Sequence, residues 1–457
     1  MKEKCAVLGI YSHDEVFDRI RYGLHTLQHR GQESAGIATY TGKINIHRDM
    51  GLVSDVFKHT YFSGNSGIGH VRYSTTGESN IRNAQPLVIN YSKGVFAIAH
   101  NGNITNTGDL KSLLERRGSI FTTTTDTEII AQLIAQEHIR TGDFVEGIKN
   151  AMEHLEGAYC LTILYEGKII AVRDPWGFRP LVFGTNENEN NKTYIVASES
   201  CALDVLSLKL VRDIKPSEIL IIDDSGILST TGPKQRTAHC MFEYVYFSRA
   251  DSIINKRSVY EVRRNLGSIL LQESEVDANL VVPVPDSGIT AAVGYSENAD
   301  IPYGEALMKN RYSGRTFIMP EQNDREIGVR LKLNPIISEI KNREIVLIDD
   351  SLVRGNTTKR LIKVLREAGV GKVHVRISCP PIRFPCPYGI DMQTTGEFIA
   401  SDKSVDEIKE MIGADSLAYI SLKGLIDAIG ISKDNLCLGC LTGEYPIKSG
   451  KQMKLKG

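Results

Sequence analysis

The sequence predicts two domains in series: an antiparallel α+β layered domain, followed by an α/β domain built on a parallel sheet. Over the first 230 or so residues, short strands alternate with turn signals, as in GKINIHRDMG and GVFAIAHNGN. From about residue 250, continuously apolar strands such as NLVVPVP and EIVLIDD are each followed by a helical segment, as in buried parallel sheets. The polar, aperiodic stretch TTGPKQRTAHC is the expected crossing between the two domains.

Within the first domain, further strands are expected in YCLTILYEGKIIAVRD and SEILIIDDSG, with helical stretches near residues 16–28, 108–117 and 126–157. The length of 457 residues and the hydrophobic content of 41% suit two or three domains with sizeable cores. The sequence shows no internal repeat and no low-complexity tract.

Charge and hydropathy exclude several classes of protein. Lys plus Arg is 54 and Asp plus Glu is 55, a formal net charge of -1, which argues against a general nucleic-acid binder. No apolar run approaches the roughly 18 residues of a membrane span, and the start lacks the apolar stretch of a secretory signal. We therefore expect a cytoplasmic protein without membrane contact. Its eight cysteines are then not expected to form disulfides and need another account.

Cys5 lies four residues from the start and is followed by three motifs: HRGQESAG (29–36), HVRYSTTG (70–77) and AHNGN (99–103). A thiol attacks as thiolate, and an internal cysteine with a pKa of roughly 8.5 needs a base. If residues 1–4 are removed, Cys5 gains an α-amino group with a pKa of about 7.7 to 8.0 that can accept the thiol proton. The alternative is an ordinary core cysteine, since CAVLGIY is apolar. The motifs favour an amidase, because they supply candidate cations, anions and oxyanion donors.

The segment EIVLIDDSLVRGNTTKR (344–360) is the most specific signal of the second domain. A buried strand ends in Asp349 and Asp350 and passes through Gly355 into a helix that starts near Asn356. Backbone N–H groups at that start, with threonine hydroxyls and Arg354 alongside, form an anion site for a phosphate. The two carboxylates suit ribose hydroxyls and a Mg²⁺ ion.

Two further segments fit a phosphorylated ligand. In VVPVPDSGIT (281–290), the small residues after a buried strand let the backbone approach a diphosphate, although the segment also reads as a simple strand-ending turn. KNRYSGRTFIMP (309–320) and the following VRLKLNP resemble an active-site lid over an anionic substrate, with a solvated basic loop as the alternative. The basic residues concerned are Lys309, Arg311, Arg315, Arg330 and Lys332.

Both halves, in this order, resemble the glutamine phosphoribosylpyrophosphate amidotransferase family. The resemblance implies an N-terminal-nucleophile (Ntn) hydrolase domain, an antiparallel αββα sandwich, over residues 5–235 after a propeptide of residues 1–4. It further implies a type I phosphoribosyltransferase domain with a cluster-binding tail over residues 236–457. The implied glutaminase residues are the nucleophile Cys5, the oxyanion hole of Asn101 and Gly102, the carboxylate-binding Arg72, the amino-binding Asp126, and Arg30, Gly31 and Thr75 lining the pocket.

For the second domain, the resemblance implies binding of phosphoribosyl pyrophosphate (PRPP) and of one Mg²⁺ per subunit at Ser287, Asp349 and Asp350. Asn356 stands where the family loop usually has its first threonine, so one hydroxyl contact to the 5′-phosphate becomes an amide contact. The implied PRPP-binding residues are Asp286, Ser287, Gly288, Lys309, Arg315, Lys332, Asp349, Asp350, Ser351, Arg354, Gly355, Asn356, Thr357 and Thr358.

Four cysteines match the ligands of the 4Fe–4S cluster found in one branch of this family: Cys240, Cys386, Cys437 and Cys440. The CxxC pair alone is equally compatible with zinc or with chance. One cluster per subunit would tie the domain crossing to the C-terminal tail, a structural role. The other cysteines, Cys160, Cys201 and Cys379, are interpreted as core residues.

The implied activity is the conversion of glutamine, PRPP and water into 5-phosphoribosylamine, glutamate and pyrophosphate, which commits PRPP to purine synthesis. The family also implies purine nucleotides as feedback inhibitors and a homotetramer. Two alternatives are another Ntn glutamine amidotransferase, such as an aminosugar synthase, and a non-catalytic PRPP-sensing regulator. The first would lack IDDSLVRGNTT, and the second would have no use for an amidase domain. Glutamine-dependent pyrophosphate release separates all three.

Overall fold

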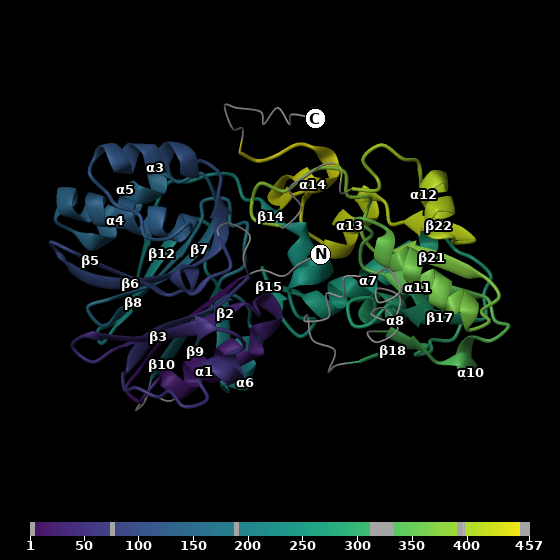
Figure 1. Cartoon of the computed structure of the whole chain (residues 1–457), viewed down its shortest axis with the longest axis horizontal. Helices are drawn as coiled ribbons and strands as arrows, with labels where there is room; N and C mark the ends of the chain where they lie inside the picture. The colour runs from purple at the N-terminus through teal and green to yellow at the C-terminus, as the bar shows by residue number, and fades with distance from the viewer. Residues whose placement is uncertain are drawn as a thin grey trace.

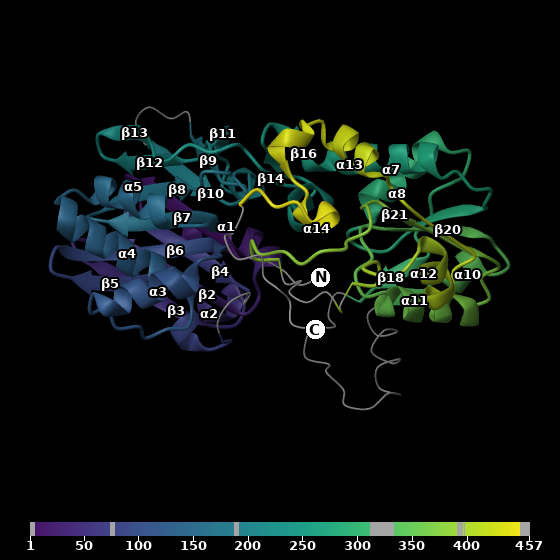
Figure 2. The same cartoon turned by 90° about the horizontal axis from the view of Figure 1, so that it is seen from above.

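The computed structural model describes residues 5–73, 78–186, 192–310, 333–390, 396 and 398–447. Within these ranges, the chain forms two antiparallel sheets in its N-terminal half and a parallel sheet in its C-terminal half. Figure 1 and Figure 2 show the two halves side by side, with α14 and the crossing segment between them. The predicted order, antiparallel layers followed by a parallel sheet, is confirmed. No helix of the described ranges is long and apolar enough to cross a membrane.

The first antiparallel sheet places the start of β1 at its centre. Its strands run in the order β11 (Lys209–Asp213), β9 (Val182–Thr185), β10 (Thr193–Ala197), β1 (Ala6–Ser12), β4 (Ser66–Arg72), β2 (Ser34–Tyr40) and β3 (Ile44–Met50). All residues of β1 are buried, as expected of a central strand. Because Ala6 lies opposite Val71, the residue before β1, Cys5, lies beside the end of β4.

The second antiparallel sheet packs face to face on the first. Its strands run in the order β13 (Gly226–Thr231), β12 (Glu218–Asp223), β8 (Lys168–Arg173), β7 (Gly157–Tyr165), β6 (Gly94–Ile104) and β5 (Leu87–Tyr91). Val7 and Val196 of one sheet and Ala97 and Leu164 of the other belong to one buried cluster, which forms the interior of the sandwich. The carboxyl end of β6 is therefore held near the start of β1.

Helices cover both outer faces of the sandwich and complete an αββα arrangement. The first sheet packs against α1 (Phe17–Thr26), α2 (Val53–Val56) and α6 (Cys201–Val205), and the second against α3 (Thr107–Arg116), α4 (Asp126–Thr141) and α5 (Phe144–His154). The helical stretch expected over 126–157 is two helices. Gly142 ends α4 with φ +78°, which side chains disfavour, and Asp143 then caps α5 by accepting from the Glu146 N–H at 2.8 Å.

The parallel sheet of the C-terminal half has the order β17 (Leu280–Pro283), β20 (Ile345–Asp349), β21 (Val373–Ile377) and β22 (Ser416–Tyr419). Figure 2 shows one group of helices on one face and a second group on the other. The first group is α7 (Val259–Glu273), α8 (Ile289–Asn298) and α13 (Leu422–Ile429); the second is α10 (Ile337–Ile340), α11 (Asn356–Glu367) and α12 (Val405–Ile412). A hairpin of β18 (Leu307–Lys309) and β19 (Leu333–Pro335) flanks the sheet.

The crossing segment is tied to the C-terminal tail by a short parallel pairing between β14 (His239–Cys240) and β23 (Leu436–Cys437). After β14, the chain makes a π-helical turn over Glu243–Phe247, and a small hairpin of β15 (Ile253–Ile254) and β16 (Arg257–Ser258) leads into α7. The tail ends its described part after α14 (Gly439–Thr442). Short 3-10 turns cover Gln28–Arg30, Ile81–Asn83 and Lys433–Asn435.

Candidate active sites

Cys5 is held by the main chain of Tyr73, which follows β4. Its Sγ lies 3.5 Å from the Tyr73 nitrogen and 3.4 Å from the Tyr73 carbonyl oxygen. The residue as a whole is half-buried, but protein surrounds the thiol, and this burial raises the pKa of Cys5 although the Tyr73 hydrogen bond and the Arg72 charge oppose the rise. In the full-length chain, the thiol is therefore mostly protonated at neutral pH, and attack requires a base.

Arg72 brings a buried positive charge beside Cys5. It is the last residue of β4 and is 2% exposed. Its Nη1 donates to the carboxylate of Glu33 and, at 3.2 Å, to the carbonyl oxygen of Glu78. The Glu33 N–H in turn donates to the Arg72 carbonyl at 3.0 Å. A guanidinium held in this way can bind a substrate carboxylate through its planar fork of donors.

Asp126 supplies the negative charge. It begins α4, accepts from the Ile104 N–H at 3.0 Å, and lies 3.5 Å from Nδ1 of His100. Burial alone would raise the pKa of Asp126, but His100 and the N–H groups of Ile104 and Thr127 outweigh it and hold the pKa below its usual range. The carboxylate therefore stays ionised at neutral pH and can bind an ammonium group.

Asn101 and Gly102 lie on β6, the strand that faces this charge pair. Asn101 is 1% exposed, and its Nδ2 has no hydrogen-bond partner among the described residues. A buried donor without an acceptor costs about 1–3 kcal/mol, so it calls for an explanation such as a bound ligand. A Cβ at Gly102 would lie 1.9 Å from the Ala158 carbonyl oxygen, which requires glycine there. The strand thus offers an amide donor where an oxyanion could form.

Arg30, which was predicted to line the glutamine pocket, lies beside the main chain of Cys5 and is 1% exposed. It pairs with Glu199 and Glu243, and its Nε donates to the Cys5 carbonyl oxygen at 3.3 Å. The role of Arg30 and Gly31 in lining a glutamine pocket stays a prediction. At Gly31 a Cβ would lie 2.7 Å from the Arg72 carbonyl carbon, so this segment packs directly on β4.

Several residues that organise the glutaminase site were missed in the sequence. Glu33 and His100 belong to the motifs HRGQESAG and AHNGN, and their position there was the only signal. Glu199 and Glu243 lie in segments with no such signal. Thr75 and residues 1–4 lie outside the described residues, so their predicted roles stay predictions.

The predicted diphosphate loop and acidic pair lie at the same edge of the parallel sheet. Pro283 of β17 lies opposite Ile348 of β20, so the loops that follow these strands are neighbours. A Cβ at Gly288 would lie 2.5 Å from the Ile348 carbonyl oxygen, which accounts for glycine between the loops. Asp286 is exposed and pairs with Lys309 at the end of β18, while Ser287 is half-buried.

Asp349 and Asp350 end β20 and are connected by short hydrogen bonds. The Asp350 N–H donates to Oδ1 of Asp349 at 2.9 Å, and the Ser351 hydroxyl donates to the Asp350 carboxylate. Burial, and then the charge of Asp350, raise the pKa of Asp349 well above its usual range. A cation bound beside the two carboxylates would favour their ionised form.

The predicted phosphate loop leads into the N-terminus of α11. Gly355 turns the chain with φ +72°, and a Cβ there would also lie 2.6 Å from Ile399. The following N–H groups, from Asn356 to Thr358, have no acceptor within the helix and suit a phosphate. Arg354, Asn356 and Thr357 are exposed and Thr358 is buried. Arg315 and Lys332 lie in 311–332, outside the described residues, together with most of the predicted lid.

The cysteines predicted to bind a cluster come together from three separate segments. Cys240 and Cys437 are opposite residues of β14 and β23. Cys386 and Cys440 line the same narrow, enclosed cavity, with Phe178, Arg179, Tyr388, Ile390 and Tyr445 around them. Burial raises the pKa of all four thiols, that of Cys240 to about 11. Such thiols ionise when a positively charged centre binds them.

Both donor sets fit the cofactors that they were predicted to hold. Within the described ranges, no three His, Cys, Asp or Glu side chains converge on one metal ion. The four thiols line one small cavity, and a cluster whose irons are each bound by a different thiolate would use all four. For Mg²⁺, one or two carboxylates with substrate phosphates are the usual ligands, so Asp349 and Asp350 are sufficient.

Comparison with known proteins gives one consistent result. Residues 70–205 match a glutamine amidotransferase domain family. The amidophosphoribosyltransferases of Methanothermobacter thermautotrophicus and Methanocaldococcus jannaschii are 51% and 50% identical, over 98% and 97% of this chain and 95% and 97% of theirs. A solved structure of glutamine PRPP amidotransferase from Bacillus subtilis, complexed with ADP and GMP, superposes with a TM-score of 0.90. It is 46% identical and covers 97% of both chains.

Proposed function

The chain belongs to the amidophosphoribosyltransferase family, and we propose that it hydrolyses glutamine at Cys5 and transfers the ammonia to PRPP at the β17 and β20 loops. The products are 5-phosphoribosylamine, glutamate and pyrophosphate, as a first step of purine biosynthesis. The observation that carries this proposal is Nδ2 of the buried Asn101, which has no hydrogen-bond partner among the described residues. Asn101 lies on β6, where the carbonyl of the preceding His100 accepts from His70 of β4.

In the glutaminase reaction, Cys5 Sγ attacks the side-chain amide carbon of glutamine and forms a thioester as ammonia leaves with the thiol proton. Water then hydrolyses the thioester, which releases glutamate and restores the thiol. Arg72 binds the α-carboxylate, and Asp126 binds the α-ammonium. The Asn101 amide and the Gly102 N–H stabilise the oxyanion, a contribution that typically reaches about 3 kcal/mol per donor. The raised thiol pKa supports removal of residues 1–4, because the new α-amino group would then serve as the base.

At the second site, Asp349 and Asp350 bind the ribose hydroxyls of PRPP and Mg²⁺, and the N-terminus of α11 binds the 5′-phosphate. Asp286, Ser287 and Gly288 approach the diphosphate from the neighbouring loop. Bound Mg²⁺ supplies charge stabilisation to the departing pyrophosphate. We place Lys309, Arg315 and Lys332 in the lid that excludes water.

Ammonia released into water would be protonated and would cease to be a nucleophile, so a sheltered route between the sites is part of the proposal. The described residues support close docking of the two halves. Nδ2 of Asn103, at the end of the oxyanion strand, donates to the Pro387 carbonyl at 2.8 Å. Gly389 packs on the same strand, since a Cβ there would lie 2.8 Å from Cβ of Asn103.

A 4Fe–4S cluster bound by Cys240, Cys386, Cys437 and Cys440 would hold this junction together. Arg179 supports the assignment, because it lines the cavity and donates to the Tyr388 carbonyl at 2.7 Å. We further propose that purine nucleotides inhibit the enzyme, which fits the ADP and GMP in the structure of the Bacillus subtilis relative. We also propose a homotetrameric assembly and a cytoplasmic location.

Replacing Cys5 by serine tests the two-site proposal. We expect the variant to lose glutamine-dependent pyrophosphate release by more than about a thousandfold, because serine is a far weaker nucleophile. Synthesis from added ammonia should stay within about twofold of the parent, because the second site is untouched. Glu218→Gln, which breaks an ion pair with Arg212 elsewhere in the sandwich, is the control. Equal loss of both activities in Cys5→Ser would contradict two separate sites.

A further inference from the structure

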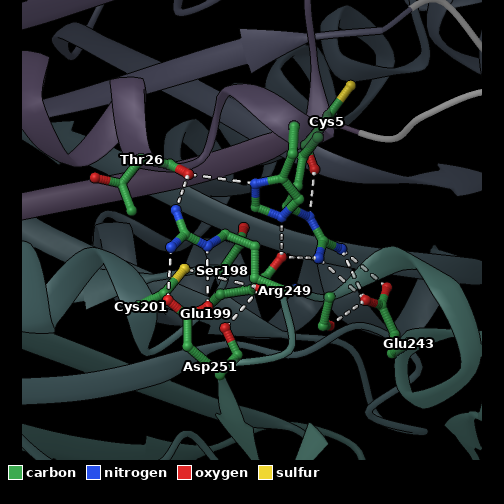
Figure 3. Close-up of polar contacts among 12 residues, drawn as sticks. Cys5, Thr26, Ser198, Glu199, Cys201, Glu243, Arg249 and Asp251 are labelled. Carbon is green, nitrogen blue, oxygen red and sulfur yellow. Dashed lines mark hydrogen bonds and ion pairs between the residues drawn. The ribbon is translucent and has the colours of Figure 1, made fainter. Parts of the chain in front are cut away.

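A group of buried charges connects the second half of the chain to the main chain of Cys5 (Figure 3). Arg30 donates through Nη1 and Nη2 to the Glu243 carboxylate at 2.9–3.1 Å and pairs with Glu199 through Nη1. Its remaining donor, Nε, reaches the Cys5 carbonyl oxygen at 3.3 Å. The side chains of Arg30, Glu199 and Glu243 are 1%, 0% and 2% exposed.

Glu243 is held by both halves of the chain. From the sandwich, Nη1 of Arg179 donates to its Oε1 at 3.2 Å, and the second half fixes the turn that carries it. The Ser248 hydroxyl donates to its carboxylate at 2.9 Å. Arg263 of α7 donates to the carbonyl oxygens of Tyr244 and Ser248 at 2.9 and 2.7 Å, and so holds both ends of the turn that carries Glu243. Because α7 is part of the domain with the parallel sheet, that domain fixes the main chain that carries Glu243.

Glu199 is a residue of the first half that accepts hydrogen bonds from the second half. It belongs to the sandwich, but the Ser252 hydroxyl and the Arg249 N–H donate to its Oε2 at 2.7 and 2.8 Å. His29 lies 2.8 Å from its Oε1. Each carboxylate thus contacts both halves. Arg30 lies between the two carboxylates, and its Nε, which neither of them accepts from, donates to the Cys5 carbonyl oxygen.

An apolar interface would stabilise the junction at least as well as this network. Buried ion pairs rarely add stability over well-packed apolar side chains, because the charges lose their hydration. What such a network does provide is directional geometry, since each donor requires its acceptor at a defined place. Here Nε of Arg30 donates to the Cys5 carbonyl oxygen, so the network constrains the backbone position of the attacking residue.

We infer that Glu243 is a positioning residue of the glutaminase reaction, through which the phosphoribosyl domain orients Cys5 by way of Arg30. This inference rests on Cys5 being the nucleophile. Binding of glutamine depends on Arg72 and Asp126 instead, so loss of Glu243 should affect turnover more than substrate affinity.

The experiment compares Glu243→Gln with Glu218→Gln in the enzyme from which residues 1–4 have been removed. It measures glutamate release from glutamine with Mg²⁺ and PRPP present. Glu218 is a matched control because it is 5% exposed and pairs with Arg212 at 2.7 Å, inside the sandwich and away from Cys5. We expect kcat to fall roughly 10- to 100-fold in Glu243→Gln, as for a slightly misplaced catalytic group, with KM for glutamine unchanged within about twofold. Ammonia-dependent synthesis should be retained in both variants.

A role limited to stability would give a different result. If Glu243→Gln keeps the parent kcat, or if kcat and ammonia-dependent synthesis fall together with the melting temperature, the inference is wrong. Should Glu243→Gln not fold, Glu243→Asp keeps the charge but withdraws it by one methylene, and the same loss of kcat at constant KM is expected. Cys5→Ser tests the proposed nucleophile separately from the positioning role of Glu243. Glutaminase activity in Cys5→Ser would contradict the nucleophile itself. Unchanged turnover in Glu243→Gln alone contradicts only the positioning role.

Discussion

In the glutaminase site, each buried charge has a protein partner of opposite sign, whereas at the end of β20 two carboxylates face each other. Arg72 is paired with Glu33, and Asp126 is held ionised by His100 and backbone N–H groups. At the other site, the pKa of Asp349 is raised by burial and by Asp350. Among the described residues, the charges of the first site are therefore matched in pairs, whereas the acidic pair of the second site is suited to a bound cation.

The proposed ligands of the two sites account for this difference. Glutamine carries one positive and one negative charge, so a site for it can be neutral and prearranged. PRPP brings several negative charges with Mg²⁺, so its site must keep acidic groups ready for the metal beside N–H donors ready for phosphate. The predictions below test this contrast, beginning with the largest expected effect.

Replacing Asp350 by asparagine should impair the second site for both nitrogen donors. Loss of a carboxylate that binds Mg²⁺ and ribose should cost at least about 3 kcal/mol of transition-state stabilisation, a hundredfold or more in kcat/KM. Initial rates with glutamine and with ammonia measure this loss of kcat/KM. Glu344→Gln, which removes an exposed ion pair with Lys372 in the same domain, is the control. Near-normal ammonia-dependent rates in Asp350→Asn would remove this pair from the site.

Replacing Cys437 by serine should release the cluster from the junction of the two sites. We expect roughly four irons per chain in the anaerobically purified parent and little in the variant. The variant should also unfold at a lower temperature, because metal binding contributes to folding. Cys201→Ser should retain its iron, since Cys201 lies on α6, outside the cavity. Full iron content in Cys437→Ser would exclude this residue as a ligand, and zinc in the parent would exclude the cluster.

The two halves should also differ in their response to acid. His70 of β4 donates from Nε2 to the His100 carbonyl at 3.0 Å, and burial, with Arg72 and His100 nearby, lowers its pKa to about 3. The unfolded chain binds this proton near pH 6.5 and the folded chain does not, so stability falls as pH decreases below 6.5. At pH 5 the loss is about 2 kcal/mol. Asp349 has the opposite sign, because its raised pKa stabilises the folded state at low pH and this contribution is lost as pH rises.

Native-state hydrogen exchange at pH 7 and pH 5, corrected for intrinsic rates, measures the pH dependence of stability for each half separately. Amides of β4 and β6 should lose protection on acidification, and this loss should be about 2 kcal/mol smaller in His70→Gln than in the parent. His154→Gln, an exposed position at the end of α5, should behave like the parent. An identical loss in parent and His70→Gln would show that His70 is not responsible.

The element types could be predicted because their signals are local. The turn signals around β6 and the apolar run of β20 indicate strands, and IDDSLVRGNTT brings the acidic pair and the predicted phosphate-binding groups together in one short segment. The break between α4 and α5 was missed, although Gly142 was visible, because both segments have the same apolar period. The four cluster cysteines were found only through the family resemblance, since one CxxC pair does not specify a metal.

By itself, the sequence determined the chemical groups: a thiol near the start, the motif residues around it, and an acidic pair before a phosphate loop. Only the tertiary structure decided which of them act on one another. Arg30 was predicted to line the glutamine pocket, yet its partners are Glu199 and Glu243, 169 and 213 residues away along the chain. Local sequence specifies the side chain and its backbone conformation, but the orientation of a buried charge depends on whichever opposite charge the fold brings within hydrogen-bond distance.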